Sequence, residues 1–98
     1  MKAYTYILGC ADGSLYTGWT TDPERRLKEH NGELPSRGAK CTRVRRPCRM
    51  LFCECFEEED AKEAKRMAMR REYAIKQLSR KEKLALIENA AEGKQSGK

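Results

Sequence analysis

Residues 3–20 read AYTYILGCADGSLYTGWT, and this stretch decides the fold. Its first six residues are rich in strand formers, and residues 15–20 are again aromatic and β-branched. Between them, Asp12-Gly13 is a strong signal for a hairpin turn. We therefore predict a β-hairpin over residues 3–20, in which Gly18 marks a bulge or a close approach to the backbone.

The residues after the hairpin carry the signals of a short helix. Asp22 suits the N-cap and Pro23 the first helical position, and the helix is expected to end near Asn31. At helical spacing, Arg26 and His30 fall on the same inward stripe as the one leucine of this segment. Both polar side chains are therefore candidates for a functional role.

The second half of the chain predicts one more strand and two helices. Residues 49–56 form the strand candidate, and the acidic residues 57–60 suit the start of a long helix that runs through Leu78. Ser79 and Glu82 form a capping box, which starts a further helix. The order β-β-α-β-α-α predicts an α+β fold, with a small, mainly antiparallel three-stranded sheet flanked by helices.

The last helix and the residues after it set the expected end of the domain. Leu84 and Ile87 are expected to face the core. Residues 92–98 are rich in Gly, Ser and Lys, and predict a disordered tail. We expect one domain over residues 1–91, because a chain this short buries only about two-thirds of its unfolded surface.

The charge of the chain favours a polyanionic partner. Lys and Arg number 21 against 15 Asp and Glu, a net charge of +6, so nucleic acid is the first candidate. The mean hydropathy is −0.89, and no run approaches the roughly 20 apolar residues of a membrane span. Since the N-terminal residues lack the pattern of a signal peptide, we expect a cytoplasmic location without a membrane partner.

The cysteines favour free thiols in a reducing compartment. Their number is odd and no CxxC occurs, unlike a secreted disulfide scaffold. The five are Cys10, Cys41, Cys48, Cys53 and Cys55. A zinc site formed by the last four lacks the usual ligand spacing, so buried structural cysteines are the preferred interpretation.

A long connector between the first helix and the third strand holds the main charge asymmetry. It spans residues 32–47, and no acidic residue occurs between Leu34 and Cys53. Its basic residues are Arg37, Lys40, Arg43, Arg45 and Arg46. The pattern is typical of a solvated basic loop, and it equally suits a loop that binds the phosphate backbone of a nucleic acid.

Two charged residues interrupt the apolar stripe of the long helix. Ala68 and Ile75 define the stripe, while Arg71 lies within it and Glu72 at its margin. A buried carboxylate is costly unless it is paired or binds a cation. Two interpretations follow: an Arg71–Glu72 pair at the rim of the core, or a carboxylate that holds Mg²⁺ or Mn²⁺ together with waters and substrate oxygens.

Three tyrosines of the hairpin, Tyr4, Tyr6 and Tyr16, are also open to two interpretations. Strand tyrosines commonly pack in the core with a polar tip. A phenol beside a cation can instead lose its proton and act as a base. His30 is either a satisfied core histidine, a phosphate contact or a proton carrier.

These residues together form a known pattern. YTY at residues 4–6 is followed ten residues later by YTG at 16–18, then by RRLKEHN at 25–31 and RE at 71–72. The pattern resembles the GIY-YIG endonuclease superfamily, in particular its small stand-alone bacterial branch. That branch is similar to the incision domain of the repair nuclease UvrC and to the nuclease domain of the Slx structure-specific endonucleases. The resemblance covers roughly residues 3–88.

The resemblance implies a metal-dependent DNA endonuclease that hydrolyses phosphodiester bonds by one-metal in-line attack. Glu72 matches the glutamate that binds a single Mg²⁺ or Mn²⁺, and Tyr16 matches the tyrosine proposed as general base. Arg26 matches the arginine that stabilises charge on the phosphate, and Tyr6 the tyrosine that ends the first motif. His30 occupies a position that is often histidine in this branch.

The resemblance also implies that DNA is the partner, with branched or damaged DNA among the targets. It further implies a role in DNA repair and a protein partner that supplies specificity.

The chain departs from the family pattern at residues 4–5 and 17, and Trp19-Thr20 stands where some members carry a lysine. A late asparagine of many active members has no counterpart. The alternatives are a non-catalytic nucleic-acid-binding module with the same fold, and a small interaction domain without a nucleic-acid partner.

Overall fold

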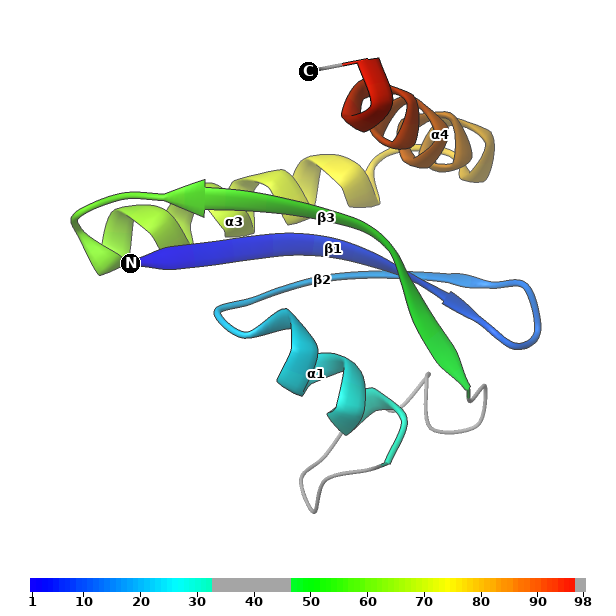
Figure 1. The fold of residues 1–98 in the computed structure, drawn as a ribbon, viewed down its shortest axis with the longest axis horizontal. Helices are drawn as coiled ribbons and strands as arrows, with labels where there is room; N and C mark the ends of the chain where they lie inside the picture. The colour runs from blue at the N-terminus through cyan, green and yellow to red at the C-terminus, as the bar shows by residue number, and fades with distance from the viewer. Residues whose placement is uncertain (33–46, 97–98) are drawn as a thin grey trace.

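The fold is a three-stranded antiparallel sheet with helices on both faces (Figure 1). The computed structural model describes residues 1–32 and 47–96, and side chains up to Ala90. Its elements are β1 (Lys2–Cys10), β2 (Leu15–Thr20), α1 (Pro23–His30), β3 (Cys48–Glu57), α3 (Ala61–Lys76) and α4 (Arg80–Ser96). The strand order is β2-β1-β3, with β1 antiparallel to both neighbours. The predicted α+β class and element order are confirmed.

The hairpin turn forms at the position that its sequence predicts. Gly13 has a φ of +86°, a conformation that side-chain-bearing residues rarely adopt. The amide of Cys10 donates to the carbonyl of Ser14 at 2.9 Å, and the Asp12 carboxylate accepts from the amide and hydroxyl of Ser14. Local chemistry therefore fixes the register in which Tyr6 lies opposite Gly18.

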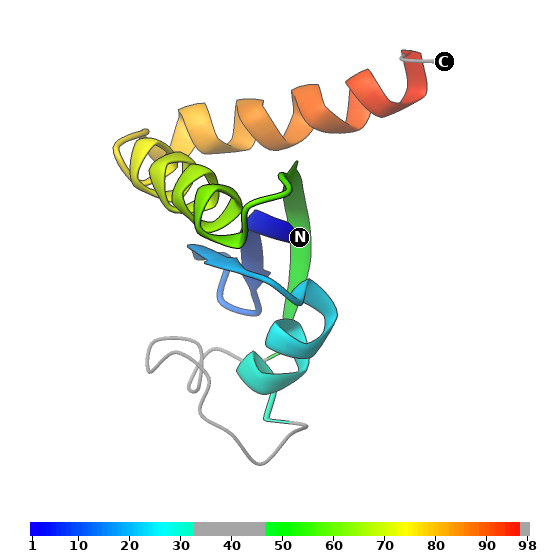
Figure 2. The same cartoon turned by 90° about the vertical axis from the view of Figure 1, so that its left-hand side faces the viewer.

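Alternating residues of β1 bury the two faces of the sheet against different helices. Tyr6, Leu8 and Cys10 pack on the face that also contacts Leu27 of α1. Ala3, Thr5 and Ile7 lie on the other face, which α3 and α4 cover (Figure 2). There the buried Thr5 hydroxyl donates to the main-chain carbonyl of Ala68 at 2.7 Å, and this bond attaches α3 to the central strand.

The C-terminal helix begins as its sequence predicts but turns a different face inward. The Ser79 hydroxyl accepts from the Glu82 amide, and the Glu82 carboxylate accepts from the Ser79 amide, so the capping box is confirmed. Leu84 is 43% exposed, and the prediction that it faces the core is wrong. Ile87 does pack toward the core, together with Leu86 and Ala90. Ala90 lies on the same stripe as Leu86 and Ile87, in contact with Ile7, Phe52 and Ile75, whereas Leu84 lies beside this stripe because successive helical residues are rotated by about 100°.

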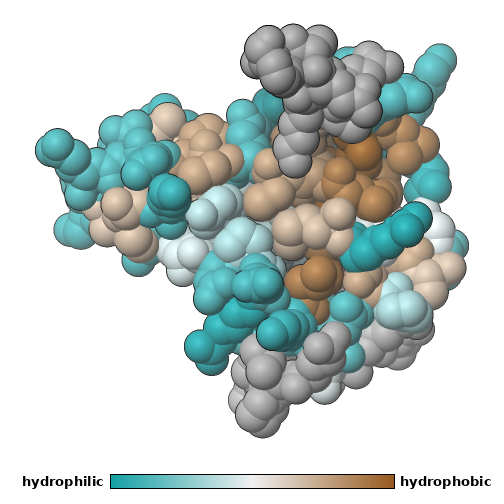
Figure 3. All heavy atoms as spheres, in the orientation of Figure 1, coloured by the Kyte–Doolittle hydropathy of each residue, from teal (hydrophilic) through white to brown (hydrophobic). Residues whose placement is uncertain are grey.

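The expected domain end at residue 91 falls inside the last helix. Helix α4 extends to Ser96, whereas we expected a disordered tail from Glu92. Residues 97–98 lie outside the described part, and the boundary of the domain stays a prediction. In the space-filling view, apolar side chains gather over β3 and beside α4, with hydrophilic side chains around them (Figure 3).

The four described cysteines are free thiols in two environments. Cys10 and Cys48 are buried, with their Sγ atoms 3.2 Å apart, as expected for structural cysteines. Cys53 and Cys55 are exposed on β3, so the buried interpretation is wrong for them. The described residues contain no group of three or more His, Cys, Asp or Glu that could hold a metal ion, and Cys41 lies outside them.

A side-chain amide joins the end of α1 to the start of β3. The Asn31 amide nitrogen donates to the Cys48 carbonyl at 2.9 Å, and its oxygen accepts from the Cys48 amide at 2.7 Å. At the other end of α1, the predicted cap is present, because the Asp22 carboxylate accepts from the Arg25 amide at 3.2 Å. Helix α1 is therefore held at both ends, and its side chains keep a fixed position against the sheet.

No helix in residues 1–32 and 47–96 is both long enough and apolar enough to cross a membrane.

Candidate functional site

The site is built on a tyrosine ring that lies across a glycine. Tyr6 of β1 is 1% exposed and pairs with Gly18 of β2. A Cβ added at Gly18 would stand 2.6 Å from the Tyr6 hydroxyl oxygen and 3.3 Å from the Tyr16 ring. The glycine therefore leaves the space through which the Tyr6 phenol crosses the neighbouring strand, and the close approach predicted at Gly18 is confirmed.

The Tyr6 hydroxyl links two side chains of α1. It lies 3.1 Å from Nε2 of His30, which is fully buried, and it also hydrogen bonds with Arg26. A guanidinium only donates, so the phenol oxygen is the acceptor in its bond with Arg26. The hydroxyl therefore joins the buried imidazole of His30 to Arg26.

Tyr16 completes an aromatic cluster with these residues. Its ring centroid lies 5.0 Å from that of His30, edge to face, and 6.5 Å from that of Tyr6. Tyr16 is only partly buried, whereas Tyr6 and His30 are closed off from solvent. Of the three rings, Tyr16 is therefore the one that a ligand in solution can reach.

The environment of Tyr6 keeps its phenol protonated. Burial raises the pKa of Tyr6 to about 12, and the nearby charges of Tyr16 and Glu72 raise it as well. The hydrogen bond and the positive charge of Arg26 lower the same pKa, but they do not offset the burial. At neutral pH Tyr6 is a hydrogen-bonding group and not a base.

Arg26 is held in place by a carboxylate of the same helix. Its Nη1 donates to Oε1 of Glu29 at 2.7 Å, and the other carboxylate oxygen accepts from Nε of Arg25 at 3.2 Å. Burial lowers the pKa of Arg26, but the bonds to Glu29 and Tyr6 outweigh it and raise the pKa above its usual value. The sequence analysis did not predict a role for Glu29. Its spacing of three residues from Arg26 and four from Arg25 on a helix is typical of ion pairs and could have indicated this role.

A polar pocket of about 410 Å³ opens beside Arg26, between the end of β2 and the start of α1. It is lined by Thr20, Thr21, Asp22, Arg25, Arg26 and Glu29. Two guanidinium groups and hydroxyls are donors that suit a phosphate group. The pocket gives a ligand access to the exposed part of Arg26, whose side chain is 29% exposed.

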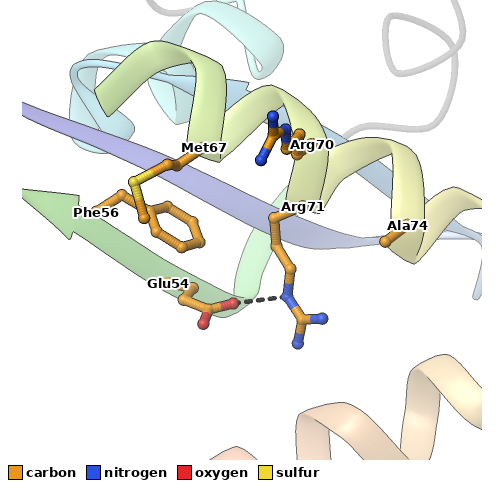
Figure 4. Close-up of a pocket in the computed structure, with 6 residues that line it drawn as sticks. All are labelled: Glu54, Phe56, Met67, Arg70, Arg71 and Ala74. Carbon is orange, nitrogen blue, oxygen red and sulfur yellow. Dashed lines mark hydrogen bonds and ion pairs between the residues drawn. The ribbon is translucent and has the colours of Figure 1, made fainter. Parts of the chain in front are cut away.

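Glu72 and Arg71 do not pair with each other, so the predicted Arg71–Glu72 pair is wrong. Nε of Arg71 donates to Oε1 of Glu54 on β3 at 2.8 Å (Figure 4). Glu72 pairs with Lys76, four residues later, at 3.0 Å, and its side chain is 21% exposed. The two neighbouring residues lie on different flanks of α3, because successive residues of a helix are rotated by about 100°.

Glu72 fits a cation that takes one protein carboxylate. It is partly exposed, its partner Lys76 is a flexible side chain that is 51% exposed, and within residues 1–32 and 47–90 no three-ligand cluster surrounds it. Mg²⁺ and Mn²⁺ commonly bind with one or two carboxylates and take their other ligands from water and phosphate. The donor set therefore suits these ions and does not suit structural zinc.

The described structure brings the predicted catalytic residues into two groups. Tyr6, Tyr16, Arg26 and His30 form one contact network between β1, β2 and α1, and Glu72 approaches it electrostatically from α3. The predicted nucleic-acid-binding residues of the connector lie outside the described residues. They are Arg37, Lys40, Arg43, Arg45 and Arg46.

Gly18→Ala should destabilise the protein and disturb the site. The new methyl group would meet the Tyr6 hydroxyl oxygen at 2.6 Å, so the ring, which is 1% exposed, would have to shift within the core. We expect the free energy of unfolding to fall by about 1–3 kcal/mol, measured by chemical denaturation. The double variant Tyr6→Phe/Gly18→Ala removes the closest atom and should recover part of the loss. Wild-type stability of Gly18→Ala would contradict the described packing.

Tyr6 should make stability depend on pH in the alkaline range. A tyrosine titrates near 10 in the unfolded chain and Tyr6 near 12 in the folded one, so the folded state holds its proton more tightly. The stabilisation is complete below about pH 10 and is lost as the pH rises to about 12, by up to about 3 kcal/mol. Denaturation at a series of pH values should show this fall, and Tyr6→Phe should remove it. Tyr73→Phe, which removes a phenol that is 70% exposed, should keep it.

The chain is similar to known proteins over most of its length. Residues 2–85 match the family model described as the GIY-YIG catalytic domain. A UPF0213 protein of Clostridium perfringens is 50% identical over 84 residues, which cover 86% of this chain and 81% of the relative. A UPF0213 protein of Staphylococcus haemolyticus is 47% identical over 87 residues, 89% of this chain and 95% of the relative.

Two solved structures are similar in sequence and in fold. The solution NMR structure of a UPF0213 protein from Bacillus halodurans has a TM-score of 0.52 at 38% identity, covering 90% of this chain and 84% of that one. The solution NMR structure of a protein from E. faecalis has a TM-score of 0.53 at 37% identity, covering 88% and 83%.

Proposed function

Since the chain belongs to the GIY-YIG catalytic-domain family, a nuclease superfamily, we propose that it is a divalent-metal-dependent DNA endonuclease. The observation that carries the proposal is the joined network of Arg26, Tyr6 and His30 beside Tyr16, with Glu72 in electrostatic reach. A purely structural core has no need of a guanidinium and a carboxylate that are both partly exposed around the buried phenol of Tyr6.

Arg26 would bind the phosphate to be cleaved. Its position is fixed by Glu29 and Tyr6, and its side chain lines the polar pocket and is 29% exposed. A charge held in place before the reaction stabilises the negative charge that develops on the phosphate without reorganisation. Tyr6 and His30 would act as positioning residues, because both are buried and touch the arginine network rather than solvent.

Tyr16 would act as the general base. In its phenolate form Tyr16 would take a proton from the water that attacks the phosphorus atom, while the bond from phosphorus to the departing sugar oxygen breaks in line with the attack and that oxygen takes a proton from solvent. A tyrosine in water titrates near 10, so positive charge around the phenol is required to favour the phenolate. Tyr6 is excluded from this role, because burial raises its pKa to about 12.

Glu72 would hold the Mg²⁺ or Mn²⁺ ion after exchange of its ion pair with Lys76. When bound, such an ion polarises the phosphodiester and offsets charge on the departing oxygen. The remaining ligands would be waters and phosphate oxygens.

DNA binding would extend beyond the catalytic residues. We include in the proposal the connector residues Arg37, Lys40, Arg43, Arg45 and Arg46, as contacts to the phosphate backbone. We further propose that the target is branched or damaged DNA and that the chain has a role in DNA repair. The proposal also includes a partner protein that supplies specificity and a cytoplasmic location.

Conversion of supercoiled plasmid to nicked circles tests the proposed activity. We expect nicking by the wild-type chain with Mg²⁺ or Mn²⁺, and none when EDTA removes the ion. A branched oligonucleotide substrate in the same assay tests the preference for structure. Salt-sensitive DNA binding without any nicking would favour the non-catalytic binding module instead, and failure to bind DNA at low salt would favour the interaction domain.

A further inference from the structure

Helix α3 carries more positive charge than its ion pairs neutralise. Six of its 16 residues are basic and two are acidic. Within the described residues, Arg66 pairs with Glu63, Arg71 with Glu54 and Lys76 with Glu72, and no ion pair involves Lys62, Lys65 or Arg70. The basic residues are not spread evenly around the helix.

One flank of α3 faces β3 and is partly covered. Met67, Arg70, Arg71 and Ala74 line a pocket of about 380 Å³ together with two residues of β3 (Figure 4). Arg71 spans the pocket to reach Glu54. This flank therefore offers one cation, Arg70, without an ion pair in the part of the chain that the structure describes.

The opposite flank carries a line of basic and apolar side chains, which we call the α3 track. Its members are Lys62, Lys65, Met69, Tyr73 and Lys76. They recur every three or four residues, so they lie on one side of the helix. Glu72 borders this line, three residues after Met69 and four before its partner Lys76.

The two apolar members of the α3 track are unusually exposed for their size. Tyr73 is 70% exposed and Met69 is 44% exposed, while Ala64, Ala68 and Ile75 make the contacts of the helix with the core. Packing therefore does not explain the aromatic side chain. An exposed ring between lysines is the arrangement that binds single-stranded nucleic acids, in which the ring stacks on a base and the cations contact phosphates.

We propose that the α3 track binds a single-stranded segment of the nucleic-acid substrate, with Tyr73 stacked on an unpaired base and Lys62 and Lys65 on the backbone. The proposal rests on the proposed nuclease function. It adds a binding surface for the nucleic-acid strand that leads away from Glu72. From residue 62 to residue 76 the helix rises about 21 Å. Bases within a duplex are already stacked on both sides, so Tyr73 selects DNA that has an unpaired segment beside the cleaved bond.

The test measures binding of a fluorescently labelled oligothymidylate in EDTA, where no cleavage occurs. We expect Tyr73→Ala to weaken binding about 5- to 100-fold and Tyr73→Phe, which keeps the ring, to stay within about twofold of wild type. A blunt hairpin duplex should bind both variants nearly equally.

Lys62 and Arg70 provide a matched pair for the charge contribution. Both are exposed cations of α3 without an ion pair among the described residues; Lys62 belongs to the α3 track, whereas Arg70 lines the pocket beside β3. Lys62→Gln should weaken oligothymidylate binding and reduce the slope of log affinity against log salt by about 0.7, whereas Arg70→Gln should change the slope little.

Equal binding by Tyr73→Ala and wild type, or equal losses for Lys62→Gln and Arg70→Gln, would overturn the α3 track. If the wild-type chain still nicks DNA in that case, the proposed function stands and only the track is wrong. If the chain never nicks DNA but loses oligothymidylate binding on Tyr73→Ala, the nuclease proposal is wrong and the binding surface stands.

Discussion

Glu72→Gln should lower the rate of DNA nicking by at least about 10³-fold while the chain stays folded. Glutamine keeps the shape of the side chain but removes the charge that binds a divalent cation. The residue is partly exposed and its ion pair with Lys76 is local, so the fold does not depend on it. The measurements are the initial rate of plasmid nicking in excess Mg²⁺ and the thermal unfolding midpoint.

Glu63→Gln is the matched control for this experiment. Glu63 lies on the same helix and pairs with Arg66 at 3.4 Å, so its substitution removes the same charge from a similar local ion pair. We expect Glu63→Gln to nick DNA at close to the wild-type rate. Equal activity of Glu72→Gln and wild type would exclude a catalytic role of the carboxylate, and equal losses in the two variants would indicate a general effect of charge.

Arg26→Ala should reduce the nicking rate by about 10²–10³-fold, the usual loss when a fixed donor to a developing negative charge is removed. Arg26→Lys keeps a charge but loses the fork of donors that joins Glu29 and Tyr6, so it should restore only part of the rate. Both variants also remove the hydrogen bond that lowers the pKa of Tyr6. Spectroscopic titration of the phenol should therefore show ionisation at higher pH than in the wild-type chain.

Arg25→Ala distinguishes the role of Arg26 from the charge of the helix. Arg25 also pairs with Glu29, but its side chain is 65% exposed and makes no hydrogen bond to Tyr6 or His30 within the part of the chain that the structure describes. Its removal should cost the nicking reaction less than about tenfold, because an exposed ion pair contributes little. If Arg25→Ala lowered the nicking rate as much as Arg26→Ala, the loss of rate would be due to the total positive charge of the pocket and not to the positioned guanidinium of Arg26.

The fold was predictable where neighbouring residues decide it. The turn at Asp12-Gly13, the cap at Asp22 and the capping box from Ser79 to Glu82 all depend on side chains that bond to the backbone within a few residues. The exposed position of Leu84 was not predictable in this way. Which side of α4 faces the sheet depends on how the whole helix packs against residues distant in sequence.

The partners of the charged site residues depend on tertiary structure in the same way. Arg71 reaches Glu54, and the two become neighbours only through the packing of α3 against β3. Burial raises the pKa of Tyr6 and depends on the tertiary structure, so residue types and spacing alone could not separate Tyr6 from Tyr16 as a base. The family resemblance suggested the roles, and the described burial supports that assignment.

The double hydrogen bond between Asn31 and Cys48 bears on how this domain can evolve. It fastens the chain on both sides of residues 33–46, so that α1 and β3 keep their positions whatever sequence joins them. Loop closure becomes only slightly more costly as a loop lengthens. Insertions, deletions or exchanged segments between these anchors should therefore leave the contacts among Tyr6, Arg26 and His30 in place.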